Sequence, residues 1–245
     1  MDVPAVPVPE SSGGFLQNLI DLYFSPREAF ARILRSPRIL VPLVVYAALV
    51  LGFTGIWMQK MDPVEFMKTQ IEESGRADRI PADQREAVIE QQAKMMPIFG
   101  WVLGPTFIAI MLLVIAATLM FVFRFFYAGE VGFKQAFAIV LWVFLAVSVI
   151  SIPVTLTVLT LKGDWNIDPN QAVQANLGLL LDKSTAAKPL WALLTSIDVF
   201  VLWMVFLLAA GFGVASRKPT SSAIWGVAIP WAIIVLCKVG WSALF

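Results

Sequence analysis

Histidine is absent from this 245-residue chain, and cysteine occurs once, at Cys237. Without histidine the chain has no Ser-His or Cys-His catalytic pair and no histidine-held zinc or haem site. A single cysteine excludes an intrachain disulfide, a CxxC redox pair and a cysteine-based zinc site. The sequence also lacks the GxxxxGK[ST] pattern that cradles nucleotide phosphates. We therefore expect no enzymatic activity, no cofactor and no metal.

Charged residues are scarce. They make up 14% of the chain, whereas 59% of the residues are hydrophobic and the mean hydropathy is +0.79. A soluble fold of this size could not bury so much apolar surface, so the composition indicates an integral membrane protein. The 18 basic and 17 acidic residues leave a net charge of +1, which offers no basic surface for nucleic acid.

Long apolar runs dominate the rest of the sequence. A bilayer-spanning helix takes about 20 residues, and none of the runs alternates as a barrel strand would. We predict an all-α, polytopic transmembrane helical bundle with five spans, near residues 39–59, 98–123, 135–161, 189–215 and 222–244. The proline-rich residues 1–14 lack the basic segment of a signal peptide and are predicted to be a disordered tail.

The orientation follows from the loops between the spans. Two loops are short and have basic flanks, which are Arg124 with Lys134 and Arg217 with Lys218. Basic residues beside short loops mark the cytoplasmic side, and tryptophans cluster at the opposite span ends. We therefore expect the N-terminus inside, the C-terminus outside, and the loops 60–97 and 162–188 on the outer face.

An amphipathic segment at residues 15–36 precedes the first span. The stretch Ser25-Pro26-Arg27-Glu28 has the pattern of a capping box with proline at the first helical position. The polar side of this predicted helix carries Arg27, Arg32 and Arg35. These arginines would contact anionic headgroups if the helix lies in the membrane interface. The alternative is a short helix packed on the protein's own spans.

A second basic and aromatic segment closes the second predicted span. Arg124 lies within residues 121–127, where five of the seven residues are aromatic. We interpret Arg124 as an interfacial anchor that reaches lipid headgroups. A specific lipid site is the sharper alternative.

The outer loops carry their own helix signals. Residues 60–97 are too many for a plain connector, and Asp62-Pro63 predicts a helix start, with a second helix after Pro81 to about Met96. The 162–188 loop starts a shorter helix at Asp168-Pro169. Two ordered outer elements indicate either a docking surface or a simple cap on the bundle.

Two ionisable residues fall within predicted spans, where such residues are candidates for function. Asp198 and Lys238 each lie about 27–28 Å from the loop that joins their spans, at 1.5 Å per residue. We predict an ion pair or a shared polar pocket. The alternative is that Asp198 meets a helix start and Lys238 extends toward water. A catalytic Ser-Lys pair of Ser242 with Lys238 fits the spacing but is disfavoured.

A polar stripe lies on one face of the third predicted span, beside Pro153. It consists of Ser148, Ser151 and Thr155. Hydroxyl groups in such positions commonly serve helix packing and satisfy the carbonyl group that proline leaves free. A solute pathway is the alternative.

The order of motifs resembles a known family over residues 15–245. The stretch Asp21-Leu22-Tyr23-Phe24-Ser25-Pro26 precedes five predicted spans, the turn Ala128-Gly129-Glu130-Val131-Gly132 joins the second to the third, and Pro153 follows. This order is similar to that of the Yip (Ypt/Rab-interacting) family in its bacterial form. The family-like residues are Asp21, Leu22, Tyr23, Pro26, Gly129, Glu130 and Pro153.

The resemblance implies a non-enzymatic membrane protein with protein partners. Bacterial relatives are associated with ABC-type exporters that use an extracytoplasmic adaptor. The resemblance therefore implies an accessory or scaffold subunit in the bacterial cytoplasmic (inner) membrane, with a homo-oligomer left open. The alternative is a small transporter, channel or lipid-handling protein that uses a polar pocket at Asp198 and Lys238.

Overall fold

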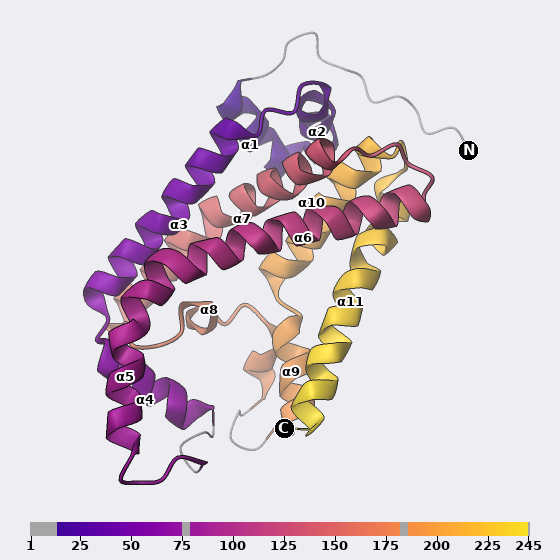
Figure 1. The fold of residues 1–245 in the computed structure, drawn as a ribbon. Helices are drawn as coiled ribbons and strands as arrows, with labels where there is room; N and C mark the ends of the chain where they lie inside the picture. Colours follow the sequence, from indigo (N-terminus) through magenta and orange to yellow (C-terminus); the bar gives the residue numbers. More distant parts are fainter. Residues whose placement is uncertain (1–13, 75–78, 182–185, 245) are drawn as a thin grey trace. The chain divides into compact units, whose positions relative to one another are not determined.

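The computed structural model describes residues 14–74, 79–181 and 186–244. Within these ranges the secondary structure is helical, with no strand (Figure 1). The prediction of an all-α fold is therefore confirmed. The tail predicted at residues 1–14 lies outside the described residues, except for Gly14.

Figure 1 labels the helices along the chain. Their bounds are α1 (Phe15–Phe24), α2 (Pro26–Arg35), α3 (Leu40–Lys60), α4 (Pro63–Glu73), α5 (Arg85–Ile98), α6 (Gly104–Phe125), α7 (Phe133–Lys162), α8 (Pro169–Ala172), α9 (Lys188–Ser196), α10 (Val199–Ala215) and α11 (Thr220–Leu244). A π-helical turn, η2 (Phe99–Leu103), joins α5 to α6, and a short 3-10 helix, η3 (Leu177–Leu180), lies before α9.

Four helical stretches in the described ranges are long and apolar enough to cross a membrane. They are Leu40–Lys60, Arg85–Phe125, Phe133–Lys162 and Thr220–Leu244, with 21, 41, 30 and 25 residues. They overlap four of the five predicted spans. The shorter apolar helix α10 has 17 residues, which is the lower end of the range for a bilayer-spanning helix.

The fourth predicted span, residues 189–215, is divided into α9 and α10. Asp198 lies at the division with an extended backbone, φ −111° and ψ 143°. Its carboxylate accepts hydrogen bonds from the backbone N–H groups of Phe200 and Val201, at 2.8 and 3.4 Å. An aspartate bonded in this way starts a new helix. The apolar run is therefore interrupted about a third of the way along, between the 9 residues of α9 and the 17 residues of α10.

The helix that contains the second predicted span begins earlier than that span. We expected an outer helix up to about Met96 and a separate span from residue 98, but α5, η2 and α6 form one stretch of 41 residues. Pro97 lies inside α5, and a proline removes a helical hydrogen bond and displaces the preceding turn. The wider π turn takes up this irregularity, and the Gly104 N–H bonds to the Phe99 carbonyl.

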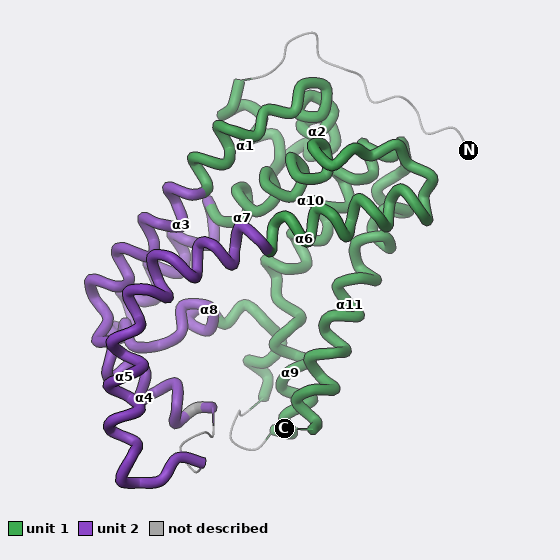
Figure 2. Tube along the Cα trace, viewed as in Figure 1, with its two compact units in different colours: residues 1–46, 111–148, 174–245 green, residues 47–110, 149–173 purple. Residues whose placement is uncertain are grey.

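The chain divides into two compact units (Figure 2). Unit 1 comprises residues 1–46, 111–148 and 174–245, and unit 2 comprises residues 47–110 and 149–173. Each unit has its own set of packing contacts.

The first half of α7 forms the core of unit 1, because its side chains are buried on every face. Those with no exposed surface are Ala136, Ala138, Ile139, Val140, Leu141, Val143, Leu145 and Ala146. Helix α10 packs against α2 and α11 in the same unit. Gly211 in α10 allows this close packing, since a Cβ atom there would lie 2.5 Å from Ile139 and 3.2 Å from the Phe30 ring.

In unit 2 the two predicted outer segments are bonded to each other. The Trp57 indole N–H donates to the Trp165 carbonyl at 3.0 Å, and the Asp62 backbone N–H donates to Asn166 Oδ1 at 2.7 Å. The Lys60 ammonium lies 4.6 Å from the centre of the Trp165 ring, a distance typical of a cation–π contact. The segment after α3 and the segment after α7 therefore form one ordered structure.

Both helix starts that the sequence predicts in these segments are present. α4 begins at Pro63, and Asp62 accepts hydrogen bonds from the next two free backbone N–H groups. α8 begins at Pro169, where Asp168 accepts from the Asn170 N–H at 2.9 Å. The aspartate satisfies N–H groups that lack an intrahelical partner, and proline fits the first helical position.

Candidate functional site

The family-like residues of α1 hold the N-terminal helices together. Asp21 forms an ion pair with Arg32 of α2, and the two side chains are only 20% and 7% exposed. The Arg32 Nε–H also donates to Asn18 Oδ1 at 3.2 Å. The sequence leaves two alternatives for Arg32, which are contact with lipid headgroups and contact with the protein itself. The structure gives it a partly buried carboxylate partner within the protein.

Leu22 and Tyr23 attach α1 to the rest of unit 1. Leu22 is completely buried. The Tyr23 hydroxyl donates a 2.9 Å hydrogen bond to the Ala146 carbonyl of α7, and its ring stacks on Trp203 of α10 at 5.5 Å. Burial raises the pKa of Tyr23 above its usual value of 10.0, because it disfavours the phenolate.

The predicted capping box at Ser25 is not formed. α2 does begin at Pro26, as expected, but the Ser25 side chain makes no capping hydrogen bond. Its backbone N–H instead donates to the Asp21 carbonyl at 2.7 Å, at the end of α1. The residue thus joins two helices rather than closing the first turn of one.

Arg27 points to the connection between α10 and α11. Its Nη1 donates to the Lys218 carbonyl at 3.2 Å and to the Thr220 hydroxyl at 3.0 Å. Arg27 and Arg32 therefore contact the protein, while Arg35 and Arg124 stay exposed. These contacts are the ones expected if residues 15–36 pack on the protein's own helices, and a position in the membrane interface stays a prediction.

The turn between α6 and α7 lies against the same connection. The Gly129 N–H donates to the Phe123 carbonyl at 3.0 Å, and Ala128 has a positive φ of 49°. A Cβ atom on Gly129 would lie 2.8 Å from Ser216 Cβ. Glycine is therefore required here by close approach to the end of α10. Its neighbour Glu130 is exposed.

Asp198 and Lys238 have different partners. No ion pair joins them in the part of the chain that the structure describes; the Asp198 carboxylate caps α10. The Lys238 ammonium donates to the Ser196 hydroxyl at 3.1 Å. Since Ser196 lies two residues before Asp198, the two groups occupy the same region without contact. A helix start at Asp198 was the alternative that we left open.

The polar stripe on α7 contains no charged group. Ser148, Ser151 and Thr155 are each half-buried, and Ser148 lies near the Tyr46 side chain of α3. Below Pro153, the Thr157 hydroxyl donates to the Pro153 carbonyl at 2.8 Å. Among the described residues no group of three metal-ligating side chains occurs either.

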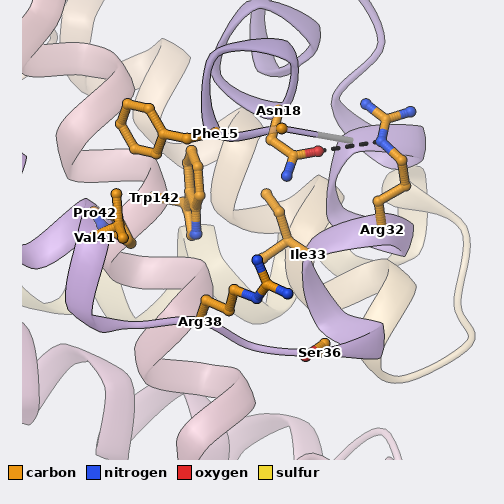
Figure 3. Close-up of a pocket in the computed structure, with 10 residues that line it drawn as sticks. Phe15, Asn18, Arg32, Ile33, Ser36, Arg38, Val41, Pro42 and Trp142 are labelled. Atoms are coloured by element: carbon orange, nitrogen blue, oxygen red, sulfur yellow. Dashed lines mark hydrogen bonds between the residues drawn. The ribbon is translucent and has the colours of Figure 1, made fainter. Parts of the chain in front are cut away.

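Sequence reasoning missed a small cavity in unit 1. It has a volume of about 140 Å³ and lies among α1, α2, α7 and the start of α3 (Figure 3). The side chains that define it include Phe15, Asn18, Arg32, Ile33, Arg38 and Trp142. Trp142 lies in an uninterrupted apolar run, so its sequence context indicates only a core position.

A family model for the Yip1 domain matches residues 20–241. Comparison with curated proteins and with solved structures finds no match. The matched range contains every family-like residue, from Asp21 to Pro153. Together with its apolar helices, this match shows that the chain belongs to the Yip family and is a multi-pass membrane protein.

Proposed function

We propose that the protein is a non-enzymatic accessory or scaffold subunit of a membrane complex. Its partners in this proposal are an ABC-type exporter and the extracytoplasmic adaptor of that exporter. The observation that carries the proposal is the ordered structure in unit 2, in which α4 packs against α5 and in which Trp57 and Asp62 are hydrogen-bonded to the segment after α7. A plain connector would not need such order.

The surface of this structure supports a protein partner. Its inner face is closed by buried side chains, which are Met61, Ile71, Ala93 and Met96. Its outer face carries exposed charges of both signs, including the pairs Glu65–Lys68 and Glu90–Lys94. Exposed pairs of this kind contribute little to stability. Their charges therefore remain free to complement a partner, which sets specificity and association rate.

A five-span topology is part of the proposal, and contacts within unit 1 support it. Arg27 bonds to the α10–α11 connection, and the Tyr127 hydroxyl donates to the Ser222 carbonyl at 3.0 Å. The N-terminal helices, the α6–α7 turn and the α10–α11 connection therefore meet, so they share one side of the membrane. An even number of crossings between them is then needed, which supports α9 with α10 as a crossing in this proposal.

The same reasoning supports opposite locations for the two ends. Three basic elements meet on one side, and a fifth crossing through α11 takes the C-terminus to the other. Because basic residues beside short loops mark the cytoplasm, we place the N-terminus inside. The proposed location is the bacterial cytoplasmic membrane, with segments 60–97 and 162–188 outside.

Gentle solubilisation at native expression, followed by identification of co-purified proteins, tests the proposal. The expected result is a stoichiometric exporter or adaptor, crosslinked through Lys68 or Lys94, which are 51% and 77% exposed. The double variant Lys68→Glu/Lys94→Glu should reduce the amount of partner recovered. Lys134→Glu, at the exposed start of α7, is the matched control and should not. A chain recovered alone would overturn the proposal.

A second candidate function has one observation in its favour. The division of the apolar run at Asp198, with the Lys238–Ser196 hydrogen bond beside it, resembles the discontinuous helices that form binding sites in transporters. A small transporter, channel or lipid-handling protein would use this region. Solute or lipid flux in vesicles that Asp198→Asn abolishes would favour it over the scaffold.

A further inference from the structure

The cavity of unit 1 contains a hydrogen-bond donor that the protein does not use. Trp142 is 4% exposed, and its Nε1–H is buried without a hydrogen-bond partner among the described residues. Buried donors in native proteins are almost always paired, and each exception calls for an explanation. A ligand that offers an oxygen atom in the cavity would supply the missing acceptor.

The cavity also carries uncompensated positive charge. Arg32 is paired with Asp21, whereas Arg38 lines the cavity and has no ion-pair partner in the described ranges. Two arginines and one aspartate leave one positive charge. Figure 3 shows the nitrogen edge of Trp142 and the Arg38 guanidinium turned toward the same space. An anion placed there would meet both.

Further donors favour an anion with several oxygen atoms. Ser36 lines the cavity and has a hydroxyl group. Val41 and Pro42, from the first turn of α3, line it as well, and helix starts favour negative charge. A tetrahedral phosphate accepts hydrogen bonds from several directions at once, and arginine is the side chain best suited to it.

The size of the cavity and the apolar surface beside it further restrict which ligands fit. The cavity has a volume of about 140 Å³ and is partly open, so it can take a small polar group while the rest of the ligand stays outside. The exposed start of α3 next to it is apolar, with Leu40, Val41 and Val44 between 50% and 73% exposed. An acyl chain could follow this surface while its phosphate occupies the cavity.

We propose that this cavity binds a phosphate-bearing anion, with the Trp142 Nε1–H and the Arg38 guanidinium as its donors. The single positive charge matches a phosphodiester monoanion, the group present in membrane lipids. Free phosphate has the same chemistry and is the other possible source. This proposal uses residues of unit 1, whereas the proposed partner surface uses residues of unit 2. Failure of one proposal therefore does not affect the other.

Native mass spectrometry of the delipidated full chain in maltoside detergent tests the proposal. The probes are dihexanoyl phosphatidylglycerol, dihexanoyl phosphatidylcholine and inorganic phosphate. We expect one bound phosphatidylglycerol, and we expect Arg38→Gln to weaken it about tenfold or more, as for loss of a charged hydrogen bond. Arg35→Gln removes the same charge from a residue that is exposed, as Arg38 is, but does not line the cavity, and it should leave binding unchanged.

The probes identify the source of the phosphate. Binding of the lipids alone assigns a headgroup, and Arg38-dependent binding of inorganic phosphate alone assigns the free ion. A second readout reports direct contact: the indole ¹⁵N–H signal lost in Trp142→Phe should shift when the ligand is added to the wild type. If no probe binds in an Arg38-dependent way, or if Arg35→Gln weakens binding equally, the proposal is overturned. The Arg38 comparison suffices even if Trp142→Phe does not fold.

Discussion

The Tyr23 hydroxyl donates a 2.9 Å hydrogen bond to the Ala146 carbonyl, 123 residues later in the chain. Ala146 has no exposed surface and belongs to the buried half of α7, so this bond anchors α1 directly to the core of unit 1. A residue of the family-like motif therefore has a structural task that involves no bound partner protein.

Stability should fall at high pH partly because of Tyr23. Burial raises the pKa of Tyr23 above 10.0 in the folded chain. Above pH 10 the unfolded chain therefore binds fewer protons than the folded chain at this residue, and linkage makes the free energy of unfolding decrease as pH rises. Tyr23→Phe should show a smaller decrease in Tm between neutral pH and pH above 10 than the wild type. An equal decrease would contradict the prediction.

Tyr23→Phe should also lower stability at neutral pH by about 1 kcal/mol, because it removes one hydrogen bond. Tyr127→Phe removes a comparable tyrosine-to-carbonyl bond, from Tyr127 to Ser222. Tyr127→Phe should therefore lower the free energy of unfolding at neutral pH by a similar amount, and it serves as the matched comparison.

Removal of the Asp21 carboxylate should be far more harmful. In Asp21→Asn the Arg32 guanidinium, with a side chain only 7% exposed, would keep its charge in a buried place without a counterion. Loss of one partner of a buried pair costs about 3–5 kcal/mol. We expect a strongly reduced Tm, and partial recovery in Asp21→Asn/Arg32→Met. A double variant less stable than Asp21→Asn would show that the pair is not the cause.

The environment of Arg32 shows what a sequence cannot predict here. The start of α2 at Pro26 depends on neighbouring residues, so the local pattern identifies it. Whether an arginine on that helix meets a headgroup or a carboxylate depends on how α1 folds back onto α2. Both interpretations fit the same residues until Asp21, eleven positions away, is placed beside Arg32.

The length of apolar runs predicts most crossings but not their internal breaks. The runs at α3, α7 and α11 were found because a membrane requires about 20 apolar residues. The run at 189–215 has the same composition, and the division at Asp198 depends on a single capping carboxylate. The cavity at Trp142 could not be predicted from the sequence, because whether an indole N–H finds a hydrogen-bond partner depends on how the helices pack.

Gly129 should not tolerate a methyl group. In Gly129→Ala the new Cβ would lie 2.8 Å from Ser216 Cβ and 3.2 Å from the Phe123 carbonyl oxygen. Overpacking of this kind costs about 1–3 kcal/mol, so we expect a lower Tm. Gly240→Ala makes the same change where no atom lies within 4 Å, and it should leave Tm unchanged or raise it. Similar losses in both variants would contradict the close approach.

Asp198 and Lys238 offer a test that separates capping from ion pairing. If Asp198 acts as the N-cap of α10, Asp198→Asn should retain nearly full stability, because asparagine caps helices as well as aspartate does. Asp198→Ala should cost about 0.5–2 kcal/mol. Lys238→Met should have little effect, since Lys238 is exposed and, among the described residues, donates to the Ser196 hydroxyl alone.

The double variant Asp198→Lys/Lys238→Asp distinguishes helix capping by Asp198 from an ion pair between Asp198 and Lys238. Lysine has no acceptor for the N–H groups of Phe200 and Val201, so the reversed pair should be no more stable than Asp198→Lys alone. An ion pair would give the opposite result: both single reversals would be harmful, Asp198→Asn would be harmful too, and the double reversal would restore Tm. Thermal unfolding of these variants in one detergent therefore decides whether the aspartate starts a helix or balances a lysine.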